Sequence, residues 1–545
     1  MTETQDTRTE TKTETSKSRE KRWRFRPRYC IEGTLFTETP LFIGSGEVFK
    51  KEIDPEDEPV EVSACMKDVN NRPIIPGSTL KGCMRQWLEE NCPEKEQLIN
   101  RVFGKGHESE TDQGRGGKVT FHDAPLEIER MEPTPLPFFN ADTQTFIEAH
   151  TCIERVTGTV AENKLFYQEV VPAGVCFSVV ITGSCDSEEE IALILAGLQG
   201  FCHDKNPLQL GSNTHSGRGG LSWHLDTVKV MEREDVKEWL EEPGEHFWHF
   251  MKELSNEELK KLEELCTSFV TEDAYHDDLT FNITLNFDSH FLVNDPPTKK
   301  EKKEAEKKIQ ELKKRKIDFN EREIKPPDFR PRKDEMNKVL LPATSFKGPL
   351  RSQAERILRT IGLYACNPAF EQESEENGEC CRKVEDSEDV KKLCLACMLF
   401  GAPGWKSPVE ISDFKLKPGK YYEFTQQEFL AIDRFTGGGM HGAKFNACAI
   451  YKPIFQGEVK INSKRLGLCG PENCQKLLGL LAFTLRDLIE GDITFGFGAS
   501  KGYGTCTADI KGWEDEGFRT MASSGVNLLK KDQEKEESGA KAPKS

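Results

Sequence analysis

The sequence predicts an α+β protein built from two tandem copies of one unit. Stretches that alternate apolar and polar residues predict strands, and apolar stretches at helical spacing predict helices. These elements do not follow the regular βαβα order of a doubly wound sheet, which favours largely antiparallel sheets. Four sequence words also recur in the same order in the two halves of the 545-residue chain. Ordered matches of this kind indicate a duplication.

The first two words predict a strand and, further along, a helix. Residues 34–42 (TLFTETPLF) are matched by 284–292 (TLNFDSHFL), and their alternation is typical of a strand. Residues 76–85 (PGSTLKGCMR) are matched by 342–351 (PATSFKGPLR), and each opens a helix of about a dozen residues. One helical face is predicted to be apolar in each copy, formed by Leu80, Met84 and Leu88 in the first and by Leu350, Ala354, Ile357 and Ile361 in the second.

The third and fourth words predict a hairpin and a glycine loop. Residues 153–158 (IERVTG) are matched by 432–437 (IDRFTG), and each leads into strands. Residues 211–219 (GSNTHSGRG) are matched by 496–504 (GFGASKGYG), and each glycine loop follows an apolar helix. Neither loop has the spacing of a Walker A or Rossmann fingerprint. They are interpreted as flat backbone that a polynucleotide could approach, with Arg218 and Lys501 supplying charge, or as simple turns.

The words divide the chain into two units with polar ends. The predicted boundaries are a disordered tail at 1–21, a first unit at 22–231, a helical connector at 232–277, a second unit at 278–519 and a disordered tail at 520–545. Two insertions interrupt the second unit, a Lys-rich one at 297–327 and a cysteine-bearing one at 366–397. The Lys-rich insertion is interpreted as a solvated helix.

Composition excludes several classes of protein. No apolar run is long enough to cross a membrane, and the N-terminus has no apolar signal region, so we expect a cytoplasmic protein without a membrane. A net charge of −18, from 75 Lys and Arg against 93 Asp and Glu, argues against a uniformly basic binder of polyanions but allows a local basic groove. In a reducing compartment, the 18 cysteines are free thiols or metal ligands rather than disulfides.

A cysteine cluster in the second unit predicts a structural zinc site. Cys394 and Cys397 form a C-x-x-C pair, preceded by Cys366 and by the adjacent Cys380 and Cys381. Four thiolates can hold Zn²⁺ tetrahedrally, and the polar residues between them could not fold by burial alone. The predicted ligands are Cys366, Cys394, Cys397 and one of Cys380 or Cys381. The alternatives are a redox pair, for which the usual βαβ context is missing, and cysteines that are merely buried.

Two pairs of cations recur at the start of the helix word. The first turn of a helix exposes backbone N–H groups and favours an anion, so cations there predict a phosphate site. Ser78 and Thr344 are the predicted N-caps. A solvated basic pair is the alternative for either copy alone, and recurrence favours the phosphate. The pairs are Lys81 with Arg85 and Lys347 with Arg351.

The histidines offer no metallohydrolase motif, because none of the 11 lies in H-E-x-x-H. One G-x-S-x-G match, at residues 498–502 (GASKG), falls inside the second glycine loop. Acid-bearing loops remain before each helix word, at residues 54–60 and 328–334. Such loops are usually only solvated.

Taken together, the four ordered words resemble the RAMP superfamily. The similarity covers about residues 30–230 and 278–512 and is to backbone subunits of type III CRISPR effector complexes, present twice in one chain as in subtype III-D. It implies a modified ferredoxin-like, RNA-recognition-motif-like core in each unit and stacking along a CRISPR guide RNA. It also implies a thumb-like hairpin at the third word, with Arg155 and Arg434, that displaces a nucleotide of the duplex.

The resemblance also implies site residues. A loop aspartate before the helix word promotes target cleavage in this family, and the best matches are Asp328 and Asp57, with Asp54, Asp295 and Asp334 as rivals. A divalent ion such as Mg²⁺ could assist. The guide RNA would be held by Lys81, Arg85, Arg155, Arg218, Lys347, Arg351, Arg434 and Lys501.

The predicted function is an RNA-guided endoribonuclease acting within a complex. Its partners would be guide RNA, single-stranded target RNA and other subunits of a type III effector complex. One alternative is an inert RNA scaffold of the same complex. The other is a stand-alone nuclease that processes repeat RNA, for which a His or Tyr acid–base pair would be expected. His215, His290 and Tyr503 lie in the words, but no position carries a His or Tyr in both copies.

Overall fold

The computed structural model describes most of the chain. The predicted N-terminal tail at 1–21 lies outside the described residues. The described ranges are 26–52, 58–106, 114–127, 139–154, 159–204, 206–242, 247–270, 278–334, 337–366, 384–385 and 387–539. No helix within these ranges combines the length and apolarity needed to span a bilayer.

The first unit is built on an antiparallel sheet. Strand β1 (Arg28–Thr37) pairs on one side with β11 (Cys176–Ser184) and on the other with β12 (Leu221–Met231). β7 (Val119–Phe121) extends the sheet beyond β11, and β13 (Lys252–Glu253) lies at the opposite edge. The spatial order is β13-β12-β1-β11-β7. Alternate residues of β1, including Ile31 and Leu35, are fully buried, as the predicted alternation requires.

Helices α2 (Gly77–Asn91), α3 (Glu96–Phe103) and α4 (Glu188–Gln199) pack together over this unit. The predicted apolar face of α2 is confirmed, because Leu80, Met84 and Leu88 are all fully buried. α6 (Asn256–Phe269), from the predicted connector, packs on α4 and buries Leu262 and Phe269 in the same core. The connector is therefore part of the first unit's core.

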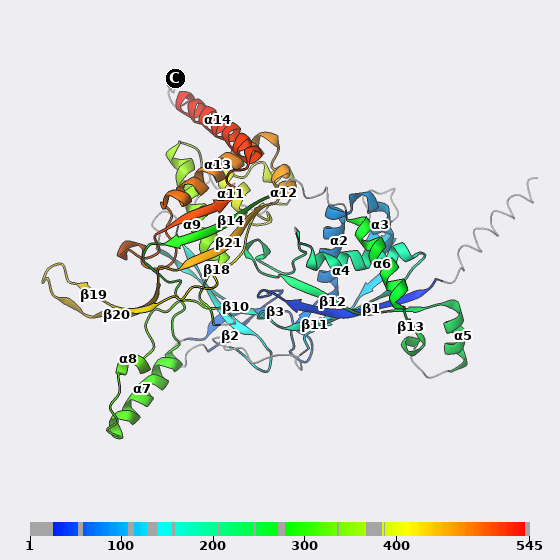
Figure 1. The fold of residues 1–545 in the computed structure, drawn as a ribbon, viewed down its shortest axis with the longest axis horizontal. Coiled ribbons are helices and arrows are strands. Elements are labelled where there is room, and N and C mark those ends of the chain that lie inside the picture. The colour runs from blue at the N-terminus through cyan, green and yellow to red at the C-terminus, as the bar shows by residue number, and fades with distance from the viewer. Residues whose placement is uncertain are drawn as a thin grey trace, which may run out of the picture.

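The second unit repeats this order. β14 (Leu279–Phe287) pairs with β21 (Ile454–Ile461) and β22 (Cys506–Lys511), so the chain again alternates strands and helices around a central first strand. β17 (Val409–Ile411) and β18 (Phe414–Leu416) both pair with β21, and β16 (Leu340–Leu341) pairs with β18. Figure 1 shows the two sheets in different parts of the molecule, with β1 and β12 on the right and β14 and β21 on the left.

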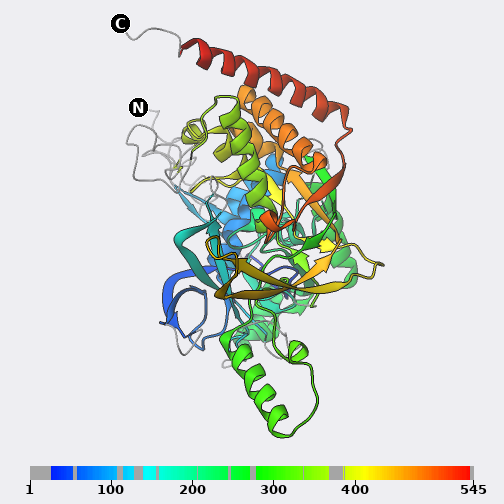
Figure 2. The ribbon, with the colours of Figure 1, turned by 90° about the vertical axis from the view of Figure 1, so that its left-hand side faces the viewer.

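The helices of the second unit include one that the sequence analysis missed. α9 (Ala343–Thr360), α11 (Leu395–Phe400) and α13 (Pro471–Glu490) correspond to α2, α3 and α4. Residues 520–539, predicted to belong to a disordered tail, instead continue α14 (Glu516–Gly539), which lies along α13 (Figures 1 and 2), and the rest of the predicted tail lies outside the described residues.

Packing against α13 explains why residues 520–539 form a helix and not a disordered tail. Phe518, Ala522 and Leu529 are buried, and Gly479 and Gly525 let α13 and α14 approach closely. Lys476 also bonds Asp532, with its Nζ 2.6 Å from the carboxylate. The charged end of the sequence obscured these three apolar residues on one helical face. α14 follows β22 as α6 follows β12, so it belongs to the repeat.

Each unit carries a second, smaller sheet. In the first unit its order is β2-β3-β10-β9, formed by β2 (Gly44–Lys51), β3 (Val60–Cys65), β9 (Phe146–Ile153) and β10 (Val160–Val170). In the second unit β15 (His290–Phe291), β20 (Gly439–Tyr451) and β19 (Phe424–Ile432) form a sheet whose β19–β20 hairpin projects from the body (Figure 1).

The remaining elements are short or peripheral. α7 (Lys299–Lys314) and α8 (Glu321–Ile324) form a projecting arm in the Lys-rich insertion, and α5 (Arg233–Glu241) begins the connector. The other helices and strands are α10 (Ser387–Val390), α12 (Ser463–Leu468), β4 (Ile74–Ile75), β5 (Gly104–Lys105), β6 (Arg115–Gly116) and β8 (Ala124–Pro125), with short 3₁₀ turns including η4 (Thr214–Ser216) and η9 (Ala499–Lys501).

The two units meet at a charged junction. Glu148 on β9 of the first unit accepts hydrogen bonds from Arg218 of the first unit and from Arg332 of the second. Glu148 is 6% exposed and Arg218 8%. The first glycine loop lies against β17 of the second unit, where an added Cβ on Gly217 would stand 3.3 Å from the Ile411 carbonyl oxygen. This joint between the units therefore combines charged hydrogen bonds with close backbone packing.

Candidate nucleic-acid interface and metal centre

The two arginines predicted to hold phosphate serve as internal anchors. Arg85 Nη1 donates to the Gly104 carbonyl at 2.9 Å, and Arg351 Nη1 donates to the Gly401 carbonyl at the same distance. Each also bonds the carboxylate four residues ahead, on Glu89 in α2 or Glu355 in α9. The recurrence of both cations thus reflects packing between two helices. Their contact with RNA stays a prediction, and these bonds give both arginines a structural role as well.

The N-termini of α2 and α9 are capped by aspartates from a neighbouring strand connection. Asp123 Oδ1 accepts the Gly77 N–H at 2.8 Å, and Asp413 Oδ1 accepts the Ala343 N–H at 2.7 Å. The residues before the helices are prolines, so the predicted caps Ser78 and Thr344 lie inside the helices. These carboxylates occupy the place that the sequence analysis gave to a phosphate.

A repeated word that the sequence analysis overlooked carries these two aspartates. Residues 119–126 (VTFHDAPL) are matched by 409–416 (VEISDFKL), and the aspartate stands at the same position in both. Their strands, β7 and β17, occupy corresponding places in the two sheets. A search for capping carboxylates beyond the helix's own neighbours in sequence would have found them.

The two lysines of the helix word lie in different surroundings. Lys81 is partly exposed in the first unit. Lys347 is 7% exposed, and its ammonium lies 3.4 Å from the Val409 carbonyl oxygen. Burial and the charge of Arg351 hold the pKa of Lys347 well below its ordinary value. Lys347 thus lies at the junction between the units, and its contact with RNA stays a prediction.

The glycine loops share one backbone conformation but present different side chains. Arg218 is buried against Glu148, and its RNA contact stays a prediction. Lys501, in the second loop, is exposed, with its Nζ 5.5 Å from the centre of the Phe497 ring. Loop two is therefore the one whose cation can reach a ligand.

The hairpin of the third word carries an exposed tip in the second unit. Phe435 is completely exposed, and Arg434 beside it is also exposed. Asp433 Oδ1 accepts the N–H groups of Phe435 and Thr436 at 2.8 Å, which fixes the turn. Arg155, at the matching tip of the first unit, lies outside the described residues. The second tip combines an aromatic ring with a guanidinium, a pair suited to stacking on nucleic-acid bases.

Asp328 lies at the base of that same hairpin. Its backbone N–H donates to Asn446 Oδ1 on β20 at 2.7 Å, and its Oδ2 accepts the Asn446 N–H at 3.1 Å. Lys302 of α7 approaches Asp328 Oδ1 at 3.4 Å. The carboxylate remains about one-third exposed. An acid held at a fixed place with one open side can bind a cation or accept a proton.

The rival aspartates fall into distinct environments. Asp334 Oδ1 accepts the Lys338 N–H at 2.8 Å in a turn that matches the one at Asp68, so its role is structural. Asn71 and Asn337 adopt the same left-handed conformation in these turns, with φ of 62° and 61°. Asp295 is half-buried, and burial raises the pKa of its carboxyl. Asp54 and Asp57 lie outside the described residues.

The register of the repeat separates the two candidate acids. Asp328 stands six residues before Asp334, as Val62 stands six before Asp68. Strand pairing gives the same alignment, because β3 runs parallel to β10 at Val62 and the chain runs parallel to β20 at Phe329. Asp328 therefore corresponds to the buried Val62 and not to Asp57. The two predicted acids are not equivalent positions of the duplication.

Three cysteines of the predicted zinc site come together. The Sγ atoms of Cys366 and Cys397 are 3.3 Å apart, and those of Cys394 and Cys366 are 3.7 Å apart. Thiolates around one tetrahedral Zn²⁺, with bonds of about 2.3 Å, lie about 3.8 Å from one another, so the triad fits this ion. All three cysteines are buried. Cys380 and Cys381 lie outside the described residues.

Arg351 links the cysteine cluster to the repeat. Its Nη2 lies 3.2 Å from Cys397 Sγ, whereas the equivalent Nη2 of Arg85 lies 2.9 Å from Asn100 Oδ1. Cys397 and Asn100 stand at the same place in the two units. A guanidinium beside a thiol favours the thiolate, which is the form that binds metal.

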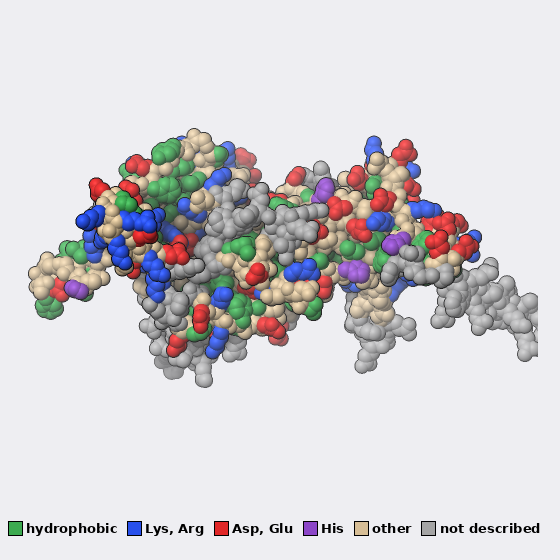
Figure 3. Space-filling model, turned by 90° about the horizontal axis from the view of Figure 1, so that it is seen from below, with side chains coloured by type: hydrophobic (Ala, Val, Ile, Leu, Met, Phe, Trp, Pro, Cys, Tyr) green, Lys and Arg blue, Asp and Glu red, His purple; other side chains and the backbone are tan. Residues whose placement is uncertain are grey.

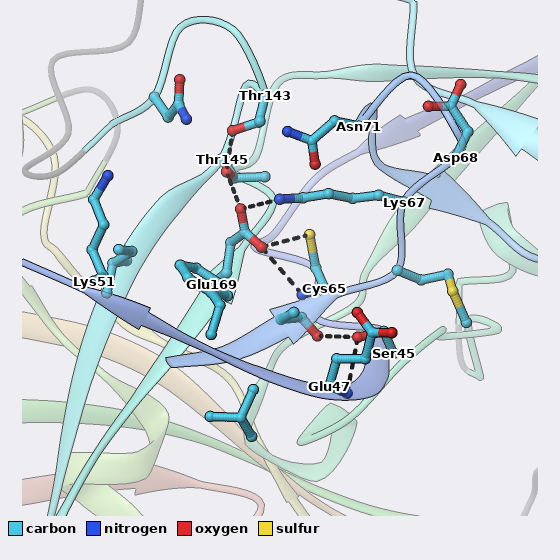
Figure 4. A pocket seen from close by; sticks show the side chains of 16 residues that line it. Ser45, Glu47, Lys51, Cys65, Lys67, Asp68, Asn71, Thr143, Thr145 and Glu169 are labelled. Atoms are coloured by element: carbon cyan, nitrogen blue, oxygen red, sulfur yellow. Dashed lines mark hydrogen bonds and ion pairs between the residues drawn. The ribbon is translucent and has the colours of Figure 1, made fainter. Parts of the chain in front are cut away.

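The first unit has a polar cleft of about 600 Å³ beside β2 and β3 (Figure 4). Its floor is Glu169, whose carboxylate accepts bonds from Lys67 at 2.6 Å, from Thr145 at 2.8 Å and from the Cys65 N–H at 3.4 Å. Cys448 takes the place of Glu169 in the register of the second unit. Because Glu169 is already bonded on both oxygens, the cleft offers little for catalysis by this acid.

Comparison with known proteins agrees with the repeated words. The RAMP superfamily model matches residues 34–222 and 268–507. The chain is also similar to the CRISPR system Cms endoribonuclease Csm3 of Streptococcus thermophilus, with 27% identity over 218 residues that cover 37% of this chain and 89% of that protein. The resemblance inferred from the four words is thereby confirmed, and the chain belongs to the RAMP superfamily, with two RAMP regions in tandem.

Proposed function

We propose that this chain is a backbone subunit of a type III CRISPR ribonucleoprotein that holds guide RNA and cleaves the paired target RNA. The observation that carries this proposal is that β20 joins two features. One end of this strand bears the exposed tip with Phe435, and Asn446, further along it, holds Asp328. The ring proposed to open the duplex, at the tip, and the proposed acid, at the base, would thus be held by one rigid element.

Each unit is further proposed to be a modified ferredoxin-like core. The chain order strand, helix, strand, strand, helix, strand recurs, and the first strand lies between the third and fourth in both sheets. RNA would then be gripped by the cations that remain accessible. Among the predicted residues these are Lys81, Arg434 and Lys501. The four buried or anchored cations support the scaffold that presents them.

Cleavage is proposed to use the ribose itself as the nucleophile. A base displaced from the duplex can turn its 2′-hydroxyl in line with the adjacent phosphorus, and such positioning can lower the barrier by several kcal/mol. Asp328 would orient that hydroxyl or accept its proton. A divalent ion such as Mg²⁺, if bound there, would supply charge stabilisation for the phosphate. The products would be a 2′,3′-cyclic phosphate and a 5′-hydroxyl.

The test is cleavage of a complementary RNA by the guide-loaded complex. Asp328→Asn keeps the size of the side chain and an oxygen that can accept the Asn446 N–H while removing the charge, so it should remove one cleavage product while target binding persists. A target with a single 2′-deoxy nucleotide just upstream of that bond should resist cutting there. Normal cutting of the deoxy target would exclude the in-line mechanism. For the first unit, Asp57→Ala tests an acid at a non-equivalent position and is expected to remove a different product.

A second candidate function is an RNA scaffold without catalysis in this subunit. Both oxygens of Asp328 are engaged, one by the Asn446 N–H and one by Lys302. A residue that only fixes the position of β20 would make the same two contacts. Under that function Asn446→Ala and Asp328→Asn would both disturb the hairpin, and every cleavage product would survive. Retention of all products in the Asp328→Asn complex would therefore favour the scaffold.

The cysteine triad is proposed to hold a structural Zn²⁺. Cys366, Cys394 and Cys397 would be three ligands, with Cys380 or Cys381 as the fourth. When bound, the ion would tie the insertion at 366–397 to α9 and α11, and Arg351 would offset part of the thiolate charge. Its role here is folding rather than reaction chemistry.

Other subunits of the effector complex are the proposed protein partners. The first glycine loop is covered by the second unit of the same chain, whereas the second loop, with Ser500 and Lys501 exposed, has the same backbone and nothing within 4 Å of an added Cβ on Gly502. The second loop is accordingly the surface to which a neighbouring subunit would dock. Crosslinking from position 500 within the assembled complex tests this.

A further inference from the structure

The projecting arm formed by α7 and α8 is a feature of the second unit alone. It begins at a complete capping box, in which Thr298 and Glu301 bond each other's backbone N–H groups. The arm extends from the body near the base of the β19–β20 hairpin and points away from α14 (Figures 1 and 2). Ala305 and Ile309, on the inner face of α7, are buried. The arm is thus a packed hairpin rather than an isolated helix in solvent.

The base of the arm is bonded to the candidate cleavage site. Glu301 makes a two-point contact with Arg330, at 2.9 and 3.2 Å, and Lys302 contacts Asp328 at 3.4 Å. Arg330 and Asp328 are two residues apart on the segment that pairs with β20. The orientation of the arm is therefore fixed relative to Asp328.

The outer face of α7 is basic. Residues 299–325 contain 12 Lys and Arg against 7 Asp and Glu, in a chain whose net charge is −18. Lys303, Lys307 and Lys314, at helical spacing, are exposed on the side opposite Ala305 and Ile309. Lys307 and Lys314 have no ion-pair partner among the described side chains and lie about 10 Å apart along the helix. Figure 3 shows Lys and Arg gathered over this arm.

We propose that the α7–α8 arm is an RNA-binding element that grips the phosphates of the target strand next to Asp328. The inference rests on the proposed function and goes beyond it by naming a contact that the first unit lacks. The arm is rigid and anchored at Asp328. An RNA strand that reaches this acid therefore also lies near the lysines of the arm. The net positive charge of the arm complements a polyanion within an otherwise acidic protein.

An acidic protein segment is the competing occupant of this face. RNA is favoured because the arm is bonded to Asp328 itself, so any RNA bound there lies beside the arm. The stripe of cations is also long and narrow, as a phosphate backbone is, and has no exposed apolar side chain among Lys303, Lys307 and Lys314 that would anchor a protein. The guide strand is held elsewhere in this scheme, so its retention should not depend on the arm.

The experiment compares two double variants in the guide-loaded complex, each in an Asp328→Asn background so that target RNA is not cut. The test variant is Lys307→Glu with Lys314→Glu. The control is Lys530→Glu with Lys531→Glu on α14, where both lysines are exposed and the charge change is the same. α14 lies at the end of the molecule opposite the arm (Figure 2). The control therefore reports the effect of net charge alone.

Target affinity should fall roughly tenfold in the arm variant at low salt and little in the control. The slope of log affinity against log salt should flatten by about 1.4, because two phosphate contacts on a single strand are lost. Guide content should be unchanged. With Asp328 restored, the arm variant should slow the cut assigned to the second unit and spare other cuts.

Each of the remaining outcomes excludes one part of the proposal. Equal target affinities in the arm and control variants would exclude the arm as an RNA contact. Loss of a protein subunit from the purified arm variant, with target affinity retained, would identify the acidic protein as occupant and overturn the proposal. Failure of the complex with Asp328 intact to cut target RNA would overturn the proposed cleavage and leave the arm to be judged by the affinity measurement alone.

Discussion

The two glycine loops have the same backbone and opposite surroundings. In the first loop Asn213, Gly217 and Gly219 have φ of 59°, 77° and 70°, and the matching Gly498, Gly502 and Gly504 have 83°, 79° and 76°. Each loop contains one short 3₁₀ turn, η4 or η9. The conformation is therefore encoded in the word itself, through residues that tolerate positive φ.

What each loop touches depends instead on its place in the tandem. The first loop packs against the second unit, where Arg218 interacts with the charge of Asp413 and His215 with that of Lys347. The second loop is exposed at Ser500 and Lys501. A duplicated word can thus keep one geometry while serving as an internal joint in one copy and as an open surface in the other. Function cannot be carried from copy to copy by motif alone.

Removing the proposed metal should give the largest difference in stability between the two units. Cys397→Asn gives the second unit the residue that the first has at Asn100, so Arg351 keeps an acceptor while a thiolate ligand is lost. We expect loss of bound zinc and a destabilisation of several kcal/mol confined to the second unit, because metal binding there contributes to folding. Elemental analysis and limited proteolysis measure the two effects.

The exposed Cys202 provides the control for that variant. Cys202→Ser should leave both metal content and proteolysis unchanged. Wild-type protein that is purified without chelators and contains no zinc would contradict the proposed centre. Equal proteolysis of both units after metal loss would show that the ion does not act locally.

Breaking the charged joint is the next largest effect. Glu148→Ala leaves Arg218 buried and Arg332 without its carboxylate, which should lower the free energy of unfolding by about 3–5 kcal/mol. The matching position in the second unit is Gln427, which accepts a neutral bond from Tyr503. Gln427→Ala should cost only about 1 kcal/mol. Urea unfolding midpoints compare the two, and equal losses would mean that Glu148 does not carry the joint.

A matched pair of glycine substitutions isolates the steric part of the joint. Gly217→Val and Gly502→Val impose a similar strain, because both glycines have φ near +78°. Only at Gly217 does the new side chain meet the other unit, where the Ile411 oxygen is 3.3 Å from the Cβ position. We expect Gly217→Val to be the more destabilising by about 1–3 kcal/mol in thermal unfolding. Equal losses would mean that the first loop does not bear on the second unit.

The duplication, the fold class and the convergence of three cysteines could be predicted from sequence, because each depends on a pattern that the residues themselves carry. Leu80, Met84 and Leu88 repeat every four residues, and Cys394 and Cys397 are close in the chain. The local signal was sufficient in each case. The turn at Asn71 is likewise indicated by its residue type, because Asn tolerates positive φ.

The roles of the cations could not be predicted in the same way. Arg351 at the start of a helix looks like a phosphate ligand, but its partner is a carbonyl 50 residues away, and the partner of Arg218 is 70 residues away. Lys347 is buried where α9 meets both Val409 of its own unit and η4 of the first unit. Long-range partners decide whether a charge faces solvent, and a single sequence does not record them.

The smallest predicted effect concerns pH at the first loop. Burial, together with Lys347, Lys406 and Arg465, lowers the pKa of His215 to about 3. The ordinary pKa of about 6.5 applies in the unfolded chain, so the unfolded state binds the extra proton between these values. The stability that His215 contributes is therefore fully present above about pH 6.5 and is lost as the pH falls below it.

The second loop supplies the control, since Ser500 stands where His215 does. His215→Ser copies it and removes the titrating group, and Lys347, Lys406 and Arg465 stay in place. The slope for one such histidine is about 1.4 kcal/mol per pH unit, so the wild type should lose up to about 2 kcal/mol more than His215→Ser between pH 7 and pH 5. Burial and Arg218 lower the pKa of His150 to about 4 in both proteins, so its contribution cancels in the difference. Parallel pH profiles of urea unfolding for the two proteins would mean that His215 is not held neutral by the joint, and the contrast between the loops would then rest on shape alone.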